Sequence, residues 1–153
     1  MFSGVRKRID QIRGSWWKVG RARRLEIYAF WRSRPVEPRS VMYESFAGNG
    51  ALCNPEALFR GLRADPEFAD LKHVWVLSNP DENPSIVREF EHDRSVRFVR
   101  PNTNGYYRAL ATSGYLINNA TFQGEFSKRA GQIYLNTWHG TPLKKMGDRK
   151  SVV

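Results

Sequence analysis

Residues 41–63 read VMYESFAGNGALCNPEALFRGLR, and this stretch decides the fold class. Its first six residues, 41–46, are mostly apolar and typical of a β-strand, and the Ala-Gly-Asn-Gly sequence that follows predicts a turn. Asn54 and Pro55 then predict the start of a helix that continues to about Arg63, with Asn54 as the N-cap and proline in the first turn. The stretch is therefore interpreted as a strand, a turn and a helix, which is how a parallel βαβ unit begins.

The same alternation continues along the chain. Further apolar runs predict strands at 73–77, 96–99, 115–118 and 133–136, and the segments between them predict helices from residue 83 or 84 to about 91 and over 104–111. Strands that alternate with helices predict the α/β class. We expect a Rossmann-like domain with a parallel sheet and right-handed crossovers over residues 41–153.

The composition of the 153 residues fits one domain with a substantial core, because 41% of them are hydrophobic. The longest uninterrupted apolar run, Ile27 to Trp31, is too short to cross a bilayer, and no secretory signal peptide is visible. Cys53 is the single cysteine, so neither an internal disulfide nor a multi-cysteine metal site can form, and no metal site is expected. These features predict a cytoplasmic protein.

The net charge of +10 is concentrated near the N-terminus. Residues 1–40 contain 11 Lys and Arg and three acids, which gives +8 there and +2 in the remainder. Pro35 and Pro38 predict a linker between this basic segment and the domain. Apolar residues at helical spacing form a narrow stripe within it: Val5, Ile9, Ile12, Trp16 and Val19.

The basic segment is interpreted as helices that lie on an anionic membrane surface, because Trp on the apolar face and Lys and Arg on the polar face suit the membrane interface. The residues expected to contact the membrane are Trp16, Trp17, Arg21, Arg23 and Arg24. Two alternatives stay open. The stripe could dock on another part of the same protein, or the cations could bind nucleic-acid phosphates.

Small polar segments follow three of the predicted strands, at residues 44–50, 118–121 and 136–142. Ligands of parallel α/β sheets bind beyond the carboxyl ends of the strands, so these segments are expected to line a binding site. The glycines form neither a dinucleotide-binding fingerprint nor a P-loop. Nicotinamide-dependent dehydrogenases and nucleoside triphosphatases are therefore excluded.

His139 is the most informative single residue. It follows a predicted strand, and Thr141 and Pro142 predict the N-cap and first position of a helix, whose positive end favours a neutral imidazole. A neutral imidazole can act as a base or donate a hydrogen bond to phosphate, although a purely structural histidine stays open as the alternative. His73 and His92 are expected at the surface or at an edge of the domain.

Four further stretches complete a recognisable pattern: YESF at 43–46, VWVL at 74–77, YLINN at 115–119 and NTWHGTPLK at 136–144. In this order and spacing the chain resembles, over residues 41–147, the CDP-glycerol:poly(glycerophosphate) glycerophosphotransferase family, the teichoic-acid primases and polymerases of bacterial cell envelopes. The Trp-His-Gly-Thr-Pro-Leu-Lys run is the most specific part. The resemblance implies that the chain is the N-terminal half of a two-domain GT-B fold, peripheral on the cytoplasmic face of the cell membrane.

The resemblance also implies a reaction. The terminal hydroxyl of a lipid-linked polyol-phosphate or glycan acceptor would attack the glycerol-side phosphate of CDP-glycerol and expel CMP, and no cofactor is implied. His139 matches the motif histidine, for which the role of general base is expected, and Gly140 and Thr141 match its neighbours in the active-site wall. Lesser candidates for lining the substrate cleft are Ser45, Gly48, Asn118 and Asn119.

The family places a second essential histidine and most donor contacts in the second domain, which lies beyond these 153 residues. The chain is therefore expected to be a partial enzyme that binds CDP-glycerol poorly and does not turn over alone. Two other functions stay open, a non-catalytic membrane-surface binding module and a GT-B transferase that uses another donor, such as CDP-ribitol or a nucleotide-sugar. Nucleic-acid binding is not expected.

Overall fold

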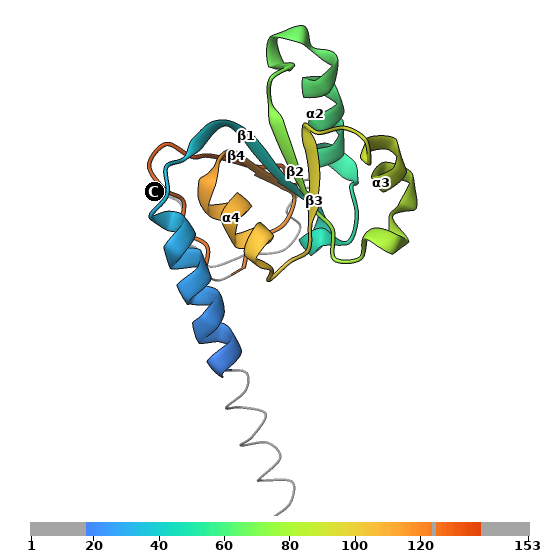
Figure 1. Cartoon of the computed structure of the whole chain (residues 1–153). Coiled ribbons are helices and arrows are strands. Elements are labelled where there is room, and N and C mark those ends of the chain that lie inside the picture. The colour runs from blue at the N-terminus through green and yellow to red at the C-terminus, as the bar shows by residue number, and fades with distance from the viewer. Residues whose placement is uncertain (1–17, 124, 139–153) are drawn as a thin grey trace, which may run out of the picture.

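The computed structural model describes residues 18–123 and 125–138, which are built around a five-stranded sheet (Figure 1). A helix covers residues 18–32. The other helices and strands are β1 (Glu37–Glu44), α2 (Cys53–Ala64), β2 (Lys72–Val76), α3 (Pro84–Phe90), β3 (Val96–Val99), α4 (Asn104–Thr112), β4 (Ser113–Asn118) and β5 (Ile133–Asn136). The strands lie in the order β3-β2-β1-β4-β5, and every neighbouring pair is parallel. The predicted Rossmann-like α/β class is confirmed.

Helices cover the two faces of the sheet in the way that right-handed crossovers require. The connections through α2 and α3 step from β1 to β3, whereas the connection through α4 steps back past β1 to β4, so α4 lies on the opposite face. On the α2 face, the core is an aromatic cluster in which Tyr43 stacks on Trp75 at 5.0 Å between ring centroids and Phe59 packs edge-on against Trp75 at 5.7 Å. On the α4 face, Met42 and Leu116 are buried beneath the helix.

β1 begins earlier than the sequence predicts. Its first residue is Glu37 rather than residue 41, so Pro38, expected in a linker, lies in the strand. The pairing of β1 with β4 shifts register between Glu37 and Val41, an irregularity that accommodates the missing N–H of proline. The two backbones approach closely there, because a Cβ on Gly114 would lie 2.9 Å from the Pro38 Cα.

The expectation that His73 lies at the surface is wrong. His73 is only 2% exposed, since both faces of β2 are covered, and its Nδ1 lies 3.0 Å from the Tyr43 hydroxyl. Burial lowers the pKa of His73 to about 4, with a smaller contribution from the positive charge of Arg63, so the ring is neutral at physiological pH. His92 has a largely exposed side chain, as predicted.

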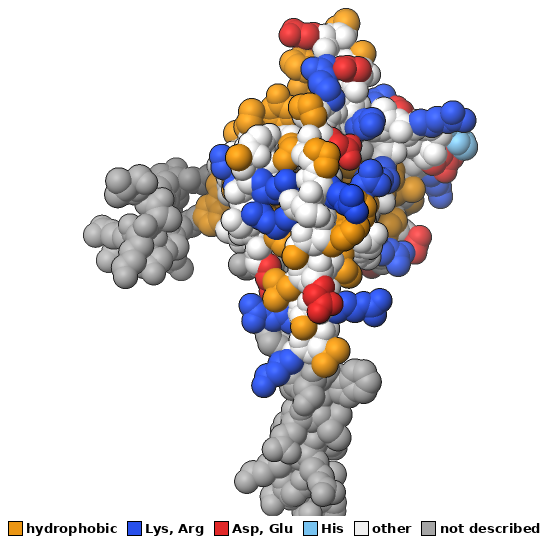
Figure 2. All heavy atoms as spheres, turned by 60° about the vertical axis from the view of Figure 1, so that its left-hand side comes forward, with side chains coloured by type: hydrophobic (Ala, Val, Ile, Leu, Met, Phe, Trp, Pro, Cys, Tyr) orange, Lys and Arg blue, Asp and Glu red, His pale blue; other side chains and the backbone are white. Residues whose placement is uncertain are grey.

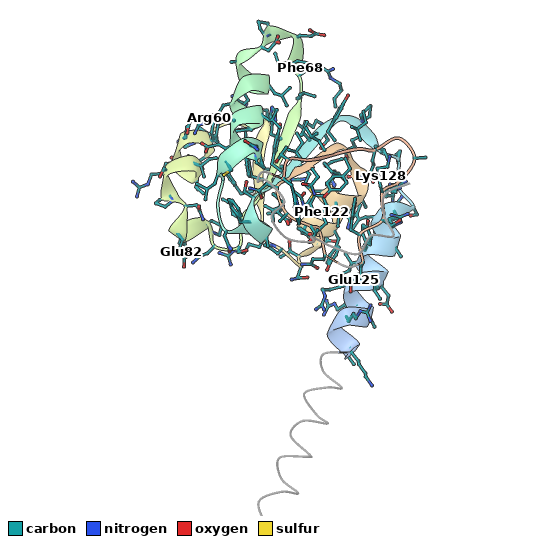
Figure 3. The ribbon with its side chains drawn as sticks, turned by 180° about the vertical axis from the view of Figure 1, so that it is seen from behind. Arg60, Phe68, Glu82, Phe122, Glu125 and Lys128 are labelled. Carbon is teal, nitrogen blue, oxygen red and sulfur yellow. The ribbon has the colours of Figure 1, made fainter. Side chains whose placement is uncertain are left out.

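Helix 18–32 docks on the α4 face, but not through the predicted apolar stripe, of which Val19 is the one described member and is exposed. Tyr28 is buried in the core of that face, and the Trp31 indole N–H donates to the Asn104 side-chain oxygen at 2.8 Å. Arg21 forms an ion pair with Glu125 of the β4–β5 connection at 3.0 Å. Figure 3 shows Glu125 beside this helix. The docked part of the basic segment is thus held by contacts at both of its ends.

The outer surface of helix 18–32 remains available for other contacts. Arg23 is exposed, and Val19 and Phe30 are large apolar residues with exposed side chains. Figure 2 shows Lys and Arg side chains on both sides of the helix where it leaves the sheet. Trp16 and Trp17 lie outside the described residues. Among the residues described, no helix combines the length and apolar character needed to cross a membrane.

Candidate functional site

The candidate site lies at the carboxyl ends of β1 and β4, where the strand order reverses direction. Glu44 and Asn118, the last residues of these two strands, are partners in the parallel register and are both buried. Connections leave the two strands toward opposite faces of the sheet, and such a switch point is where open α/β sheets bind ligands. The structure thus brings together the first two polar segments predicted to line a site, and the described part of the third, residues 136–138, begins at the same edge.

Ser45 and Gly48 shape the loop that follows β1. The Ser45 hydroxyl is fully buried and donates to the Leu52 carbonyl at 2.8 Å, which closes the loop onto the start of α2. Gly48 adopts a φ of 87°, and its carbonyl accepts from the Ser78 N–H at 2.7 Å, which ties the loop to the end of β2. Both residues therefore set the shape of the loop at this edge of the sheet.

The side-chain oxygens of Asn118 and Asn119 each accept a hydrogen bond from a neighbouring residue. Asn118 Oδ1 accepts from the Tyr134 hydroxyl at 2.9 Å, and Asn119 Oδ1 accepts from the Phe46 N–H at 2.8 Å. Both amide nitrogens are buried and have no hydrogen-bond partner among the described residues. A buried donor without an acceptor costs about 1–3 kcal/mol. The pair is therefore suited to bind an acceptor oxygen from a ligand or an ordered water molecule.

Glu44 is a candidate functional residue that the sequence reasoning did not select. Its carboxyl is 4% exposed. Burial raises the pKa of Glu44 to about 7, and the nearby Tyr106 hydroxyl acts in the opposite direction. The available signal was an acid at the end of an apolar strand, directly before the small residues of the loop. A carboxyl that is half ionised near neutral pH can accept or donate a proton at the switch point.

The segment that leads into His139 is fixed to the same edge. The Thr137 N–H donates to the Asn118 carbonyl at 2.7 Å, and the Trp138 indole N–H donates to the Ala120 carbonyl at 2.9 Å. Asn54, expected as an N-cap, lies instead inside the first turn of α2, where its amide donates to the Thr137 carbonyl at 3.2 Å. His139, Gly140 and Thr141 themselves lie outside the described residues.

Replacement of Gly48 by alanine is expected to lower the free energy of unfolding by about 1–3 kcal/mol, as measured by urea denaturation. The φ of 87° is unfavourable for a residue with a Cβ, and that Cβ would lie 2.8 Å from the Ser78 hydroxyl oxygen. Gly61→Ala in α2 is the matched control, since its Cβ would meet nothing within 4 Å. This control should gain about 0.5–1 kcal/mol from helix propensity. Equal stability of Gly48→Ala and the wild type would contradict the strained loop.

The described residues contain no cluster of three or more His, Cys, Asp or Glu side chains that could hold a metal ion. Among the residues described at this edge, the groups suited to chemistry are the neutral amide donors of Asn118 and Asn119 and the buried carboxyl of Glu44.

Comparison with known proteins gives a consistent family relationship. Residues 26–152 match the family model described as CDP-Glycerol:Poly(glycerophosphate) glycerophosphotransferase. The chain is 29% identical over 118 residues to a teichoic acid poly(glycerol phosphate) polymerase of Staphylococcus epidermidis, covering 77% of this chain and 15% of the relative. It is 30% identical over 111 residues to a teichoic acid glycerol-phosphate transferase of Staphylococcus aureus, covering 70% of this chain and 25% of that relative.

The fold is also similar to that of a solved structure, the wall teichoic acid polymerase TagF, with a TM-score of 0.71 and 25% sequence identity. The match covers 97% of this chain and 34% of the polymerase chain. The present chain therefore spans about a third of that solved chain, and a smaller part of the two staphylococcal relatives.

Proposed function

Because the chain belongs to the CDP-glycerol:poly(glycerophosphate) glycerophosphotransferase family, we propose that it forms the N-terminal catalytic half of an enzyme of teichoic-acid synthesis. The enzyme transfers glycerol phosphate from CDP-glycerol to a lipid-linked polyol-phosphate or glycan acceptor. One observation carries the proposal. The family match extends across the switch point of the sheet, where buried donors and a buried carboxyl stand beside the strand that leads to His139.

In the proposed reaction, the terminal hydroxyl oxygen of the acceptor attacks the glycerol-side phosphorus of CDP-glycerol. A new phosphodiester P–O bond forms as the P–O bond to CMP breaks, and CMP leaves with the bonding electron pair. His139 takes the proton of the attacking hydroxyl, and Gly140 and Thr141 line the wall of the site. The position of Trp138 supports this assignment, because its hydrogen bonds fix the residue before His139 at the ligand-binding edge.

The neighbouring residues supply binding and orientation. The amide nitrogens of Asn118 and Asn119, which have no partner among the described residues, would donate to phosphate or glycerol oxygens. Ser45 and Gly48 hold the loop that limits the site. Glu44 would hold a hydroxyl of the polyol, since a buried carboxyl with a pKa of about 7 can serve as acceptor or donor. A second domain, outside this chain, would complete the GT-B fold and bind most of the nucleotide.

We further propose that the protein is cytoplasmic and peripheral on the inner face of the cell membrane. Trp16, Trp17, Arg21, Arg23 and Arg24 would contact anionic lipid. The exposure of Arg23 and of the apolar Val19 and Phe30 side chains on helix 18–32 supports this orientation. Arg21 would interact with lipid while it keeps its ion pair with Glu125.

The test is CMP release from CDP-glycerol by the longest natural form of this protein, with membranes as the source of acceptor. We expect release with CDP-glycerol, and less than a tenth as much with CDP-ribitol or a nucleotide-sugar at the same concentration. A preference for one of the other donors would mean that the protein has the same fold but uses a different donor substrate. Liposome co-sedimentation without any transfer would favour a non-catalytic membrane-binding module.

A further inference from the structure

A basic pocket of about 160 Å³ lies at the amino ends of the strands, on the α4 face. The pocket lies apart from the candidate site along β1, because Ser40 on its wall precedes Glu44 by four residues, or roughly 13 Å at about 3.3 Å per residue. The reaction proposed at the carboxyl edge uses none of the residues that line this pocket.

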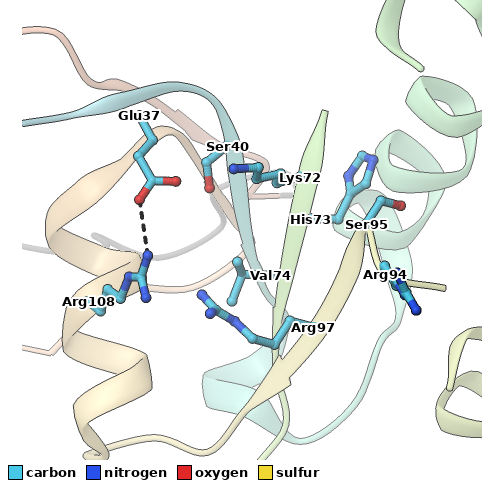
Figure 4. A pocket seen from close by; sticks show the side chains of 9 residues that line it. All are labelled: Glu37, Ser40, Lys72, His73, Val74, Arg94, Ser95, Arg97 and Arg108. Atoms are coloured by element: carbon cyan, nitrogen blue, oxygen red, sulfur yellow. Dashed lines mark hydrogen bonds and ion pairs between the residues drawn. The ribbon is translucent and has the colours of Figure 1, made fainter. Parts of the chain in front are cut away.

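Four cations line this pocket, and three of them, from three different elements, converge on one space. Lys72 begins β2, Arg97 lies in β3 and Arg108 lies in α4. Arg97 is the register partner of Val74, two residues after Lys72, so both cations project from the same face of the sheet. Figure 4 shows the guanidinium groups of Arg97 and Arg108 and the ammonium group of Lys72 turned toward one space.

The cations of this pocket are incompletely neutralised. Glu37 is the single acid among the residues that line it, and its carboxylate is paired with Arg108 at 3.4 Å. The side chains of Arg97 and Lys72 form no hydrogen bond or ion pair within the described part of the chain. Burial, and to a smaller extent the positive charge of Arg108, lower the pKa of Arg97, and the charge of Glu37 opposes them, yet a guanidinium stays charged at any physiological pH. The like charges therefore repel each other, and an anion would relieve that repulsion.

Hydrogen-bond donors surround the space and acceptors are few. The Ser40 hydroxyl lies on the wall, opposite the guanidinium groups, and already interacts with Ser113. His73 contributes to the lining but turns its ring to the other face, toward Tyr43. Planar guanidinium groups with several N–H donors match the oxygens of a phosphate group, and an ammonium group adds a compact positive charge.

We infer that this pocket, formed by Lys72, Arg97 and Arg108, binds a phosphate group. The ligand is a phosphate monoester or diester, either free in solution or part of a lipid headgroup. Arg108 connects the pocket to helix 18–32, since its guanidinium lies 5.3 Å from the centroid of the Trp31 ring. A bound phosphate would thus stand next to the helix that carries the exposed cations.

The experiment measures binding of inorganic phosphate and of glycerol 3-phosphate to the full 153-residue chain by calorimetry at low salt. Arg97→Gln is expected to weaken binding of both ligands roughly tenfold, the equivalent of about 1.4 kcal/mol. Glu37→Gln is expected to tighten binding, because it removes the competing carboxylate. Arg94→Gln is the matched control, since Arg94 also lines the pocket but its guanidinium points away from the space between the other three cations, and it should change affinity less than twofold. Thermal unfolding of each variant establishes that it is folded.

Sedimentation with vesicles that contain phosphatidylglycerol distinguishes the two sources of the phosphate. If Arg97→Gln lowers vesicle binding and Arg94→Gln does not, the ligand is a lipid headgroup. If only binding of the soluble phosphates changes, the ligand is a free phosphate ester. The inference is overturned if the wild type shows no saturable binding of either kind, or if Arg94→Gln and Arg97→Gln lower affinity equally.

Discussion

Replacement of His139 by alanine in the longest natural form of this protein is expected to lower CMP release from CDP-glycerol by roughly 10²–10⁴-fold, the usual contribution of a general base. The expectation rests on the match of His139 to the family's motif histidine. It is supported by the hydrogen bonds that fix Thr137 and Trp138 at the carboxyl edge of the sheet. The measurement is the initial rate of CMP release at saturating CDP-glycerol with a membrane acceptor.

His92→Ala is the matched control for this variant, because the His92 side chain is largely exposed and lies at the end of α3. It should leave the rate within twofold of the wild type. Circular dichroism and liposome co-sedimentation should be the same for both variants. A fully active His139→Ala variant would leave the family relationship intact and reduce His139 to a structural role.

The second large effect concerns how the free energy of unfolding depends on pH. Glu44 and His73 contribute to this dependence with opposite signs. Glu44 keeps its proton in the folded state up to about pH 7, whereas the unfolded chain loses it near 4.5. Its contribution to the free energy of unfolding is therefore complete below about pH 4.5 and is lost as the pH rises to 7. His73 is neutral in the folded state down to about pH 4, whereas the unfolded chain gains a proton near 6.5. Its contribution is complete above about pH 6.5 and is lost as the pH falls to 4.

Each of these shifts corresponds to about 3 kcal/mol when fully expressed. Between about pH 4.5 and 6.5 the two slopes cancel in the wild type, so the pair contributes almost no pH dependence. In Glu44→Gln, the free energy of unfolding should rise by up to about 3 kcal/mol from pH 4 to 6.5. In His73→Asn, it should fall by a similar amount from pH 4.5 to 7.

Urea denaturation at intervals of half a pH unit measures both profiles. The difference between each variant and the wild type removes the contributions of the other carboxyls, which are common to all three proteins. Parallel profiles for the wild type and Glu44→Gln would mean that Glu44 is ionised throughout this range. In that case Glu44 would not be the proton-holding group that its burial indicates.

Much of the fold could be predicted because parallel strands leave a strong signal in sequence. Runs such as 73–77 and 115–118 are largely apolar on both faces. Pro84 marks the first residue of a helix. The predicted range of the first strand starts too late, at residue 41 instead of Glu37, because proline normally ends regular structure. A local register shift, which pattern alone cannot reveal, accommodates Pro38 in β1.

The site was harder to predict because burial is a property of the folded chain. Glu44 and His73 carry side chains that usually face solvent, and only the pairing of β1 with β2 and β4 shows that both lie inside. The segment with Asn118 and Asn119 was selected because it stands at the end of a predicted strand, and in the structure this end lies at the carboxyl edge beside the end of β1. The docking of helix 18–32 was likewise beyond the sequence, since Tyr28, which is buried in the core, lies outside the predicted apolar stripe.

The close approach of β1 and β4 at Gly114 has a consequence for how the sequence can evolve. A side chain at this position would collide with the backbone at Pro38, so no single substitution at 114 is tolerated while β1 keeps its present path. Position 114 can change only together with the start of β1. Substitutions at Pro38 and at Gly114 should therefore co-vary among related sequences, although the two residues lie 76 positions apart.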